Sequence, residues 1–409
     1  MWFASMASNV GTWMHTVAAS WLMTTIATSP LPVALVQTAT SMPMFLLGLP
    51  AGAIADLVDR RRLLIFTQSW MLAAAAVLGV LALAGVIGPW TLLALTFALG
   101  LGSGMNGPAW AAAIPELVSR EELAAAVALN SVQFNIARAI GPALGGFVMA
   151  ASSAGIVFLL NAVSFLGVIL VLGRWREARP AGSAERVPLD QSGVHKAMRQ
   201  GLHYVRSTPA YHAVLIRTGL FSFAGSALWA MLPVVTSATL ARTSTGYGIL
   251  LGCLGAGAVV GAAILAPLRR RFSEDRIVVA GVMLFAVATL ALATIHNFGV
   301  VALAMLVGGV AWMTAMSTFS VCAQTAPPLW LRARALAVYL MVFQGALAVG
   351  SGIWGEIAGR IGVRVSLLVS AATLVAGLAA GFWLPLSARE EEAPLDLVAD
   401  AQGEGGSDG

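Results

Sequence analysis

Charged residues are scarce in this chain. Lys, Arg, Asp and Glu make up 10% of the 409 residues, whereas 59% are hydrophobic, and the mean hydropathy is +0.86. Soluble domains carry about 25% charged residues, so an ordinary soluble protein is excluded and an integral membrane protein is indicated. The net charge of +5 does not indicate nucleic-acid binding, because the basic residues fall in short loops and form no single basic face.

Cysteine and clusters of reactive side chains are scarce as well. Cys253 and Cys322 lie inside apolar runs, where small buried hydrophobic residues are the better interpretation than a disulfide. The five His show no metal-ligand spacing, so we expect no metal and no cofactor. The sequence holds no Walker A motif and no Ser/His or Asp/His constellation within an apolar run, which argues against an ATP-driven pump and a membrane enzyme.

Twelve apolar runs are long enough to cross a bilayer as helices, which requires about 20 residues each. The predicted spans are Trp2–Ile26, Pro32–Ile54, Leu63–Val86, Trp90–Ile114, Ala125–Ala150, Ala154–Leu172, Ala213–Val235, Tyr247–Leu268, Ile277–Ile295, Val300–Ala323, Leu336–Ile357 and Val365–Leu384. We therefore predict an all-α membrane protein of twelve transmembrane helices in two six-helix halves.

The loops divide the chain and orient it. Residues 1–173 form the predicted N-terminal half and 210–386 the C-terminal half, joined by a linker at 174–209 with an amphipathic helix. Residues 387–409 are acidic and Gly-rich and are predicted to be disordered. All Lys and Arg residues fall in alternate loops, the linker and the tail, except Arg138, Arg217, Arg242, Arg360 and Arg364. Their side is cytoplasmic by the positive-inside rule, so both termini are expected there, in the plasma or inner membrane.

A constant offset of 209 residues relates the two halves. It carries Gly48 and Gly52 onto glycines, the triplet Arg60–Arg62 onto Arg269–Arg271, and Gly141 and Gly146 onto Gly350 and Gly355. Internal duplication is frequent in transporters. Asp56 and Asp59 have no acidic counterpart in the second copy, so the halves are predicted to share a scaffold and to differ in charge.

Two motifs stand out within this pattern. The first joins Gly52 and Asp56 to the charged sequence Asp59, Arg60, Arg61 and Arg62 at a membrane edge. The second runs from Arg138 through Gly141, Pro142, Gly145 and Gly146, where proline bends the helix and glycines permit close helix packing. Arg138 is either a side chain that reaches to the interface or a positive site facing protein.

The first motif resembles motif A of the major facilitator superfamily, and the second resembles the antiporter motif of that superfamily's exporters. Ser8, Asn9, Gly11, Thr12 and Trp13, with Pro115–Val118 and Ala128–Ser131, resemble the branch that contains the enterobactin exporter and the transmembrane secretion effector permeases. The resemblance implies a conformational latch made by Gly52, Asp56, Asp59 and Arg60–Arg62. It also implies a bend at Gly141–Gly146 that seals the path against leak.

The same resemblance implies a substrate cavity lined by the first, fourth and seventh spans. The candidate cavity residues are Asn9, Trp13, His15, Asn106 and Trp229. Polar residues also include Thr12 and Thr16 in the first span, and intramembrane polar groups normally face protein or a water-filled cavity. His15 is either hydrogen-bonded between helices or involved in substrate binding or proton handling.

We therefore expect a secondary transporter that exports small amphipathic molecules, such as a drug, a siderophore or a metabolite, by alternating access. Proton antiport is implied by the resemblance, although the acidic residue that many drug–proton antiporters carry in the first span is absent. The alternatives are a nutrient uptake permease of the same fold and, in another class, a membrane receptor or intramembrane enzyme. Expected partners are a small-molecule substrate, protons and lipid, with the chain acting as a monomer.

Overall fold

The computed structural model describes residues 2–119, 121–174, 208–328 and 331–386, and every regular element within these ranges is helical. The predicted linker helix and the predicted disordered tail lie outside the described residues. In the first half the helices are α1 (Trp2–Ile26), α2 (Pro30–Leu57), α3 (Arg60–Leu83), α4 (Pro89–Leu117), α5 (Leu123–Ala151) and α6 (Ala154–Arg174).

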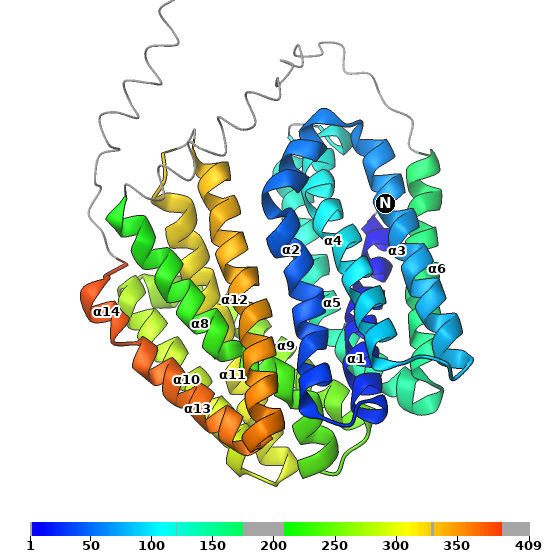
Figure 1. The fold of residues 1–409 in the computed structure, drawn as a ribbon. Helices are drawn as coiled ribbons and strands as arrows, with labels where there is room; N and C mark the ends of the chain where they lie inside the picture. The colour runs from blue at the N-terminus through cyan, green and yellow to red at the C-terminus, as the bar shows by residue number, and fades with distance from the viewer. Residues whose placement is uncertain (1, 120, 175–207, 329–330, 387–409) are drawn as a thin grey trace, which may run out of the picture.

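The second half begins with α8 (Pro209–Val234), which continues into a π-helical turn, η1 (Val235–Thr239). The remaining helices are α9 (Ser244–Arg269), α10 (Glu274–Thr294), α11 (Phe298–Thr325), α12 (Arg332–Ile361), α13 (Val363–Gly377) and α14 (Ala380–Trp383). The all-helical class and the two-half organisation are thus confirmed, and Figure 1 shows the halves side by side, with α1 to α6 beside α8 to α14.

The first eleven predicted spans match their helices to within four residues at either end. The twelfth prediction, one helix over Val365–Leu384, is wrong. The helix α13 ends at Gly377, a residue of weak helix propensity, and the chain turns before the short helix α14. This turn brings the segment after α14 back against α8 and α10.

Nine helices in the described residues are long and apolar enough to cross a membrane, and α13 is a shorter apolar helix. The helices α1 and α4, of 25 and 29 residues, are not among the nine. Their length suffices for a span, but both carry many polar side chains. Some of those side chains, including Thr12 and Thr96, line a cavity described below.

Two seams join the halves, one between α2 and α12 and the other between α5 and α9. At the second seam, a Cβ added to Gly146 would lie 2.5 Å from the Ser244 carbonyl oxygen and 3.0 Å from the Gly248 Cα. At the first seam, a Cβ on Gly355 would meet the Cβ of Ala34. Gly355 is Gly146 shifted by 209 residues, so the repeat that relates the sequences also relates the two seams.

Both glycine contacts lie far from the basic end, which we define as the end of the bundle with Arg60–Arg62 and Arg269–Arg271. Gly146 is near the last turn of α5, and its partner Ser244 begins α9. Gly355 is near the end of α12, which packs there on the beginning of α2. The halves are therefore in close backbone contact at the end opposite the arginines.

The helix α9 divides its glycines between two neighbours. Gly248, Gly252 and Gly255 lie against α5 of the other half. Further along, Gly257 lies against the Leu306 carbonyl of α11, and Gly309 of α11 lies against the Leu254 carbonyl of α9. The absence of side chains at these crossings lets the two backbones touch. The first part of α9 thus belongs to the seam, and the second part is fixed to its own half.

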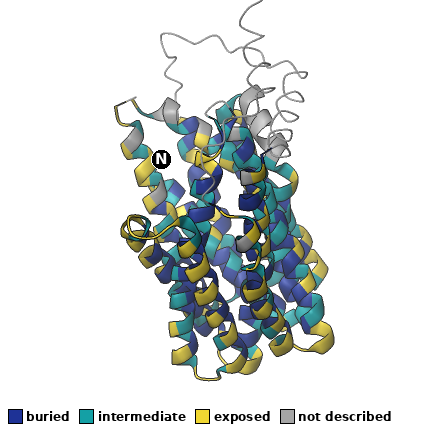
Figure 2. Cartoon of the chain, turned by 90° about the vertical axis from the view of Figure 1, so that its left-hand side faces the viewer, coloured by how far each residue is buried: buried dark blue, intermediate teal, exposed yellow. Residues whose placement is uncertain are grey.

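Each half also has a buried interior, and Figure 2 shows buried residues gathered toward the middle of the bundle. In the second half, Phe221, Phe285, Trp312 and Phe319 pack as an aromatic cluster, with the ring centroids of Phe221 and Trp312 5.2 Å apart. The first half is filled by smaller and aliphatic side chains around Phe158. Aromatic packing therefore fills the second half, while the first half contains the larger described cavity.

Candidate functional site

A cavity of about 210 Å³ lies within the first half. Its wall comes from five helices of that half, α1, α2, α3, α4 and α6, and from one residue of the other half, Gln344 on α12. The lining residues are Thr12, His15, Thr16, Ala19, Val36, Thr40, Met44, Met71, Thr96, Leu99, Gly100, Ser103, Gly104, Asn161, Phe165 and Gln344. The cavity is thus a pocket of one half that the second half helps to close.

His15 is the predicted cavity residue that lines this pocket. Its side chain is 6% exposed, and neither Nδ1 nor Nε2 has a hydrogen-bond partner. Its ring stands against Phe158 of α6, with centroids 4.6 Å apart. The alternative in which His15 is hydrogen-bonded between helices is therefore wrong in this conformation, and both ring nitrogens are buried without a partner.

The other predicted cavity residues do not line the pocket. Asn106 accepts hydrogen bonds from Thr67 Oγ1 at 3.1 Å and Gln68 Nε2 at 3.2 Å, and so joins α4 to α3 within the first half. Trp229 packs edge-on against Trp312, with centroids 5.6 Å apart. Asn9 is partly buried on α1 and is not part of the pocket wall.

Trp13, the remaining predicted cavity residue, faces α5 and forms part of the second motif. A Cβ on Gly141 would lie 2.6 Å from the Trp13 Cβ, and a Cβ on Gly145 would lie 2.7 Å from the Cα of Met14. Gly141 and Gly145 thus let α5 approach α1, while Gly146 faces α9 across the seam. Pro142 lies within α5, and its carbonyl oxygen faces Gly248 of α9. The second motif therefore packs on both halves.

Arg138 is held at the same junction. Its guanidinium carbon lies 5.9 Å from the centre of the Trp13 ring, a geometry in which the ring quadrupole attracts the cation. Its Nε is buried and has no hydrogen-bond partner. The Arg138 side chain thus lies between α5 and α1. It is not part of the pocket wall.

The first motif shows local contacts where its side chains are described. Asp59 Oδ1 accepts a hydrogen bond from the Arg62 backbone at 2.8 Å and caps α3. Arg61 donates to the carbonyls of Leu172 at 3.0 Å and Gly173 at 2.8 Å, where a cation suits the carboxyl end of α6. Both contacts stay within the first half. Gly52 and Asp56 belong to α2, but the surroundings of these two residues lie outside the described structure.

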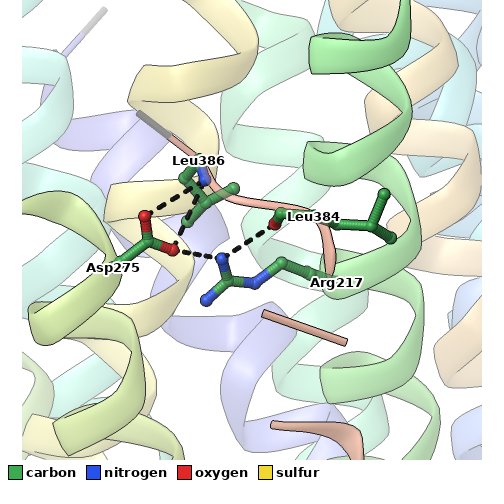
Figure 3. Close-up of polar contacts among 4 residues, drawn as sticks. All are labelled: Arg217, Asp275, Leu384 and Leu386. Atoms are coloured by element: carbon green, nitrogen blue, oxygen red, sulfur yellow. Dashed lines mark hydrogen bonds and ion pairs between the residues drawn. The ribbon is translucent and has the colours of Figure 1, made fainter. Parts of the chain in front are cut away.

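Arg217 has a partner that the sequence did not indicate. It lies within α8, is 5% exposed, and forms an ion pair with Asp275 in the first turn of α10. Arg217 also donates to the Leu384 carbonyl at 3.2 Å, and Asp275 accepts from the Leu386 backbone at 3.2 Å (Figure 3). Asp275 falls in a predicted loop, so only the fold shows that the two residues meet.

Most polar residues of the pocket were also missed, including Thr96, Ser103 and Gln344. Part of the pocket could have been predicted from residue spacing. Thr12 and Thr16 are four residues apart on α1, and Thr96, Gly100 and Ser103 lie on one face of α4. Such spacing places side chains on a common helix face. No comparable pattern marks Gln344, whose place in the wall depends on how the halves pack.

Comparison with known proteins agrees with this architecture. A family model described as transmembrane secretion effector matches residues 1–401. The staphyloferrin A transporter of Staphylococcus aureus is 25% identical over 344 residues, covering 84% of each chain. The multidrug efflux pump Tap of Mycolicibacterium fortuitum is 25% identical over 364 residues, covering 87% of this chain and 86% of that protein.

Among solved structures, an inward-facing bacterial homologue of the human lysosomal transporter Spinster superposes with a TM-score of 0.73. Its sequence is 15% identical, and the match covers 94% of this chain and 95% of that one. The likeness confirms the transporter fold. The family match over nearly the whole chain confirms the resemblance that motifs at Gly52–Arg62 and Gly141–Gly146 predict, and the chain belongs to the transmembrane secretion effector family of major facilitator transporters.

Proposed function

We propose that this transporter exports small amphipathic molecules across the plasma or inner membrane by alternating access. The observation that carries the proposal is the pocket of about 210 Å³, which places polar side chains beside apolar ones inside an apolar bundle. Gln344 is contributed to its wall by the second half. A movement of one half against the other would therefore change the pocket, which is what alternating access requires.

The basic end of the bundle determines which side of the membrane each end faces in this proposal. Arg60–Arg62 and Arg269–Arg271 are expected to face the cytoplasm, with both termini on that side. The close contacts of Gly146 and Gly355 then lie at the outer side. We infer that this conformation is closed toward the outside, and that the first motif, including Asp56, acts as a latch at the cytoplasmic side in the opposite conformation.

The direction of transport is supported by two facts. The second motif resembles that of exporters, and one relative is named as a multidrug efflux pump. We further propose that the chain works as a monomer in lipid, because both halves of the pathway belong to one chain. Export would be driven by proton antiport, for which collapse of a pH gradient in proteoliposomes provides the test.

Export itself is tested by a panel of chemically diverse amphipathic compounds in cells with and without the protein. We expect lower accumulation of at least one compound when the protein is present. Ser103→Phe fills the pocket and should abolish this effect. Ser69→Phe, on the exposed face of α3, is the matched control. Higher accumulation would indicate uptake, and equal activity of the Ser103→Phe variant would remove the pocket from the pathway.

A further inference from the structure

The pocket wall combines apolar side chains with polar ones, and none of its described residues is charged. Its described lining includes Thr, Ser, Asn, Gln and His, and none of the lining residues that the structure describes is Asp, Glu, Lys or Arg. The positive charge of Arg138 lies against Trp13, outside this wall. A charged group that gives up hydration against this wall would gain no opposite charge in return, which is unfavourable. The composition of the wall therefore favours an uncharged occupant.

Two side chains of the wall carry buried hydrogen-bonding atoms that have no partner. The hydroxyl groups of Thr12, Thr16 and Thr40 donate to carbonyls of their own helices, at 2.8 to 3.0 Å. In contrast, both ring nitrogens of His15 and the Oγ1 of Thr96 are buried without a partner. Leaving such a group unsatisfied costs about 1–3 kcal/mol, so each of these atoms favours a ligand that can pair with it.

The chemistry of His15 and Thr96, which line the same pocket, suits a ligand that both donates and accepts hydrogen bonds. A neutral imidazole has one donor and one acceptor nitrogen, and a threonine hydroxyl can act in either role. Hydroxyl and carboxamide groups have the complementary pattern without a charge. A volume of about 210 Å³ is smaller than the roughly 300–1,000 Å³ of sites that enclose drug-sized molecules, so the pocket holds one portion of a larger molecule.

We propose that the pocket is a subsite for an uncharged hydrogen-bonding group of the transported molecule, a hydroxyl or carboxamide, which pairs with His15 and Thr96. The proposal rests on the proposed transport function. Gln344 borders the same space from the other half, so the subsite loses part of its wall when α12 moves away from α2. The group would be bound in this conformation and released as the halves move.

The test measures binding and does not require a known substrate. Diethyl pyrocarbonate transfers an ethoxycarbonyl group to a neutral imidazole nitrogen, with release of ethanol and carbon dioxide. Purified full-length protein in lipid nanodiscs is treated with this reagent, and modification at His15 is followed by mass spectrometry. The exposed His296 is the internal control. Three probes of similar shape are compared as protectants: benzamide, benzoate and benzyltrimethylammonium.

We expect His15 to react and benzamide to slow its reaction by about threefold or more, the effect of one net hydrogen bond, without slowing His296. Benzoate and benzyltrimethylammonium should protect less. Thr96→Val should weaken protection by benzamide, while Thr294→Val, at an exposed position of α10, should not. Equal protection by a charged probe, an unreactive His15, or full protection in Thr96→Val would overturn the subsite.

The outcomes also separate this proposal from the proposed function. Protection by benzamide in a protein that exports nothing from the compound panel would sink the export proposal and leave the subsite in place. Export that persists while benzamide gives no protection would sink the subsite and leave export in place.

Discussion

Arg217 of α8 and Asp275 of α10 form an ion pair, and each residue also binds the segment that follows the last membrane helix. Arg217 holds the Leu384 carbonyl, and Asp275 holds the Leu386 backbone nitrogen. A Cβ on Gly381 would lie 3.3 Å from the guanidinium of Arg217. The pair thus joins three parts of the second half, and its arginine is buried in the protein.

Removing one partner should be more harmful than removing both. Asp275→Ala leaves the buried guanidinium without its counter-charge, and we expect it to lower the free energy of unfolding by about 2–3 kcal/mol. The double variant Arg217→Met with Asp275→Leu replaces the pair with apolar groups and should be less damaged. The measurement is the fraction of monodisperse protein that survives heating. A double variant less stable than Asp275→Ala would contradict this account.

The latch prediction concerns Asp56, the carboxylate without a counterpart in the second copy. Asp56→Asn should lower transport far more than expression, because a latch of about 1–3 kcal/mol shifts populations roughly 5- to 150-fold. Asp59→Asn is the comparison within the same motif: Asp59 caps α3, and because asparagine caps a helix about as well as aspartate, the stability of this variant should be nearly unchanged. Transport is measured at equal protein level, and unchanged efflux in Asp56→Asn would count against the latch.

Arg138 lies against Trp13. Two accounts of this side chain can be tested: its guanidinium is required for transport, or the side chain only places its charge at the membrane interface. If the planar guanidinium is required, Arg138→Lys should reduce transport nearly as much as Arg138→Ala, because an ammonium does not reproduce its stacking and forked donors. If the side chain only needs to reach water, the Lys variant should be active. Efflux at matched membrane abundance distinguishes the two, and a fully active Lys variant would support the second account.

The seam at Gly146 should be intolerant of a single methyl group. Gly146→Ala would place a carbon 2.5 Å from the Ser244 carbonyl oxygen, and overpacking of this kind costs about 1–3 kcal/mol. Gly167→Ala, where no atom lies within 4 Å of the added carbon, is the control. Cross-linking between cysteines placed on α5 and α9 reports seam closure. Closure equal to that of the control would mean that the glycine is not needed there.

The sequence was sufficient for the fold because long apolar runs and alternating basic loops constrain a membrane chain strongly. It was less informative for the site. Polar residues within apolar runs are unusual, and this pattern predicts both His15 and Asn106 as cavity residues. His15 lines the pocket, whereas Asn106 bridges α3 and α4. Gln344 and the pairing of Arg217 with Asp275 depend on contacts between distant segments, which local patterns do not encode.

The division of the glycines along α9 separates the rate of conformational change from the stability of the folded protein. Substitutions usually change these two quantities together. Gly248, Gly252 and Gly255 touch the other half, so contacts there must break when the halves move, and changes there alter the activation barrier between conformations. Gly257 is locked against α11 of its own half, and that contact persists through a rigid-body movement. Under the proposed movement of the halves, we therefore expect substitutions in the first part of α9 to change the turnover rate and substitutions at Gly257 to change the lifetime of the folded protein.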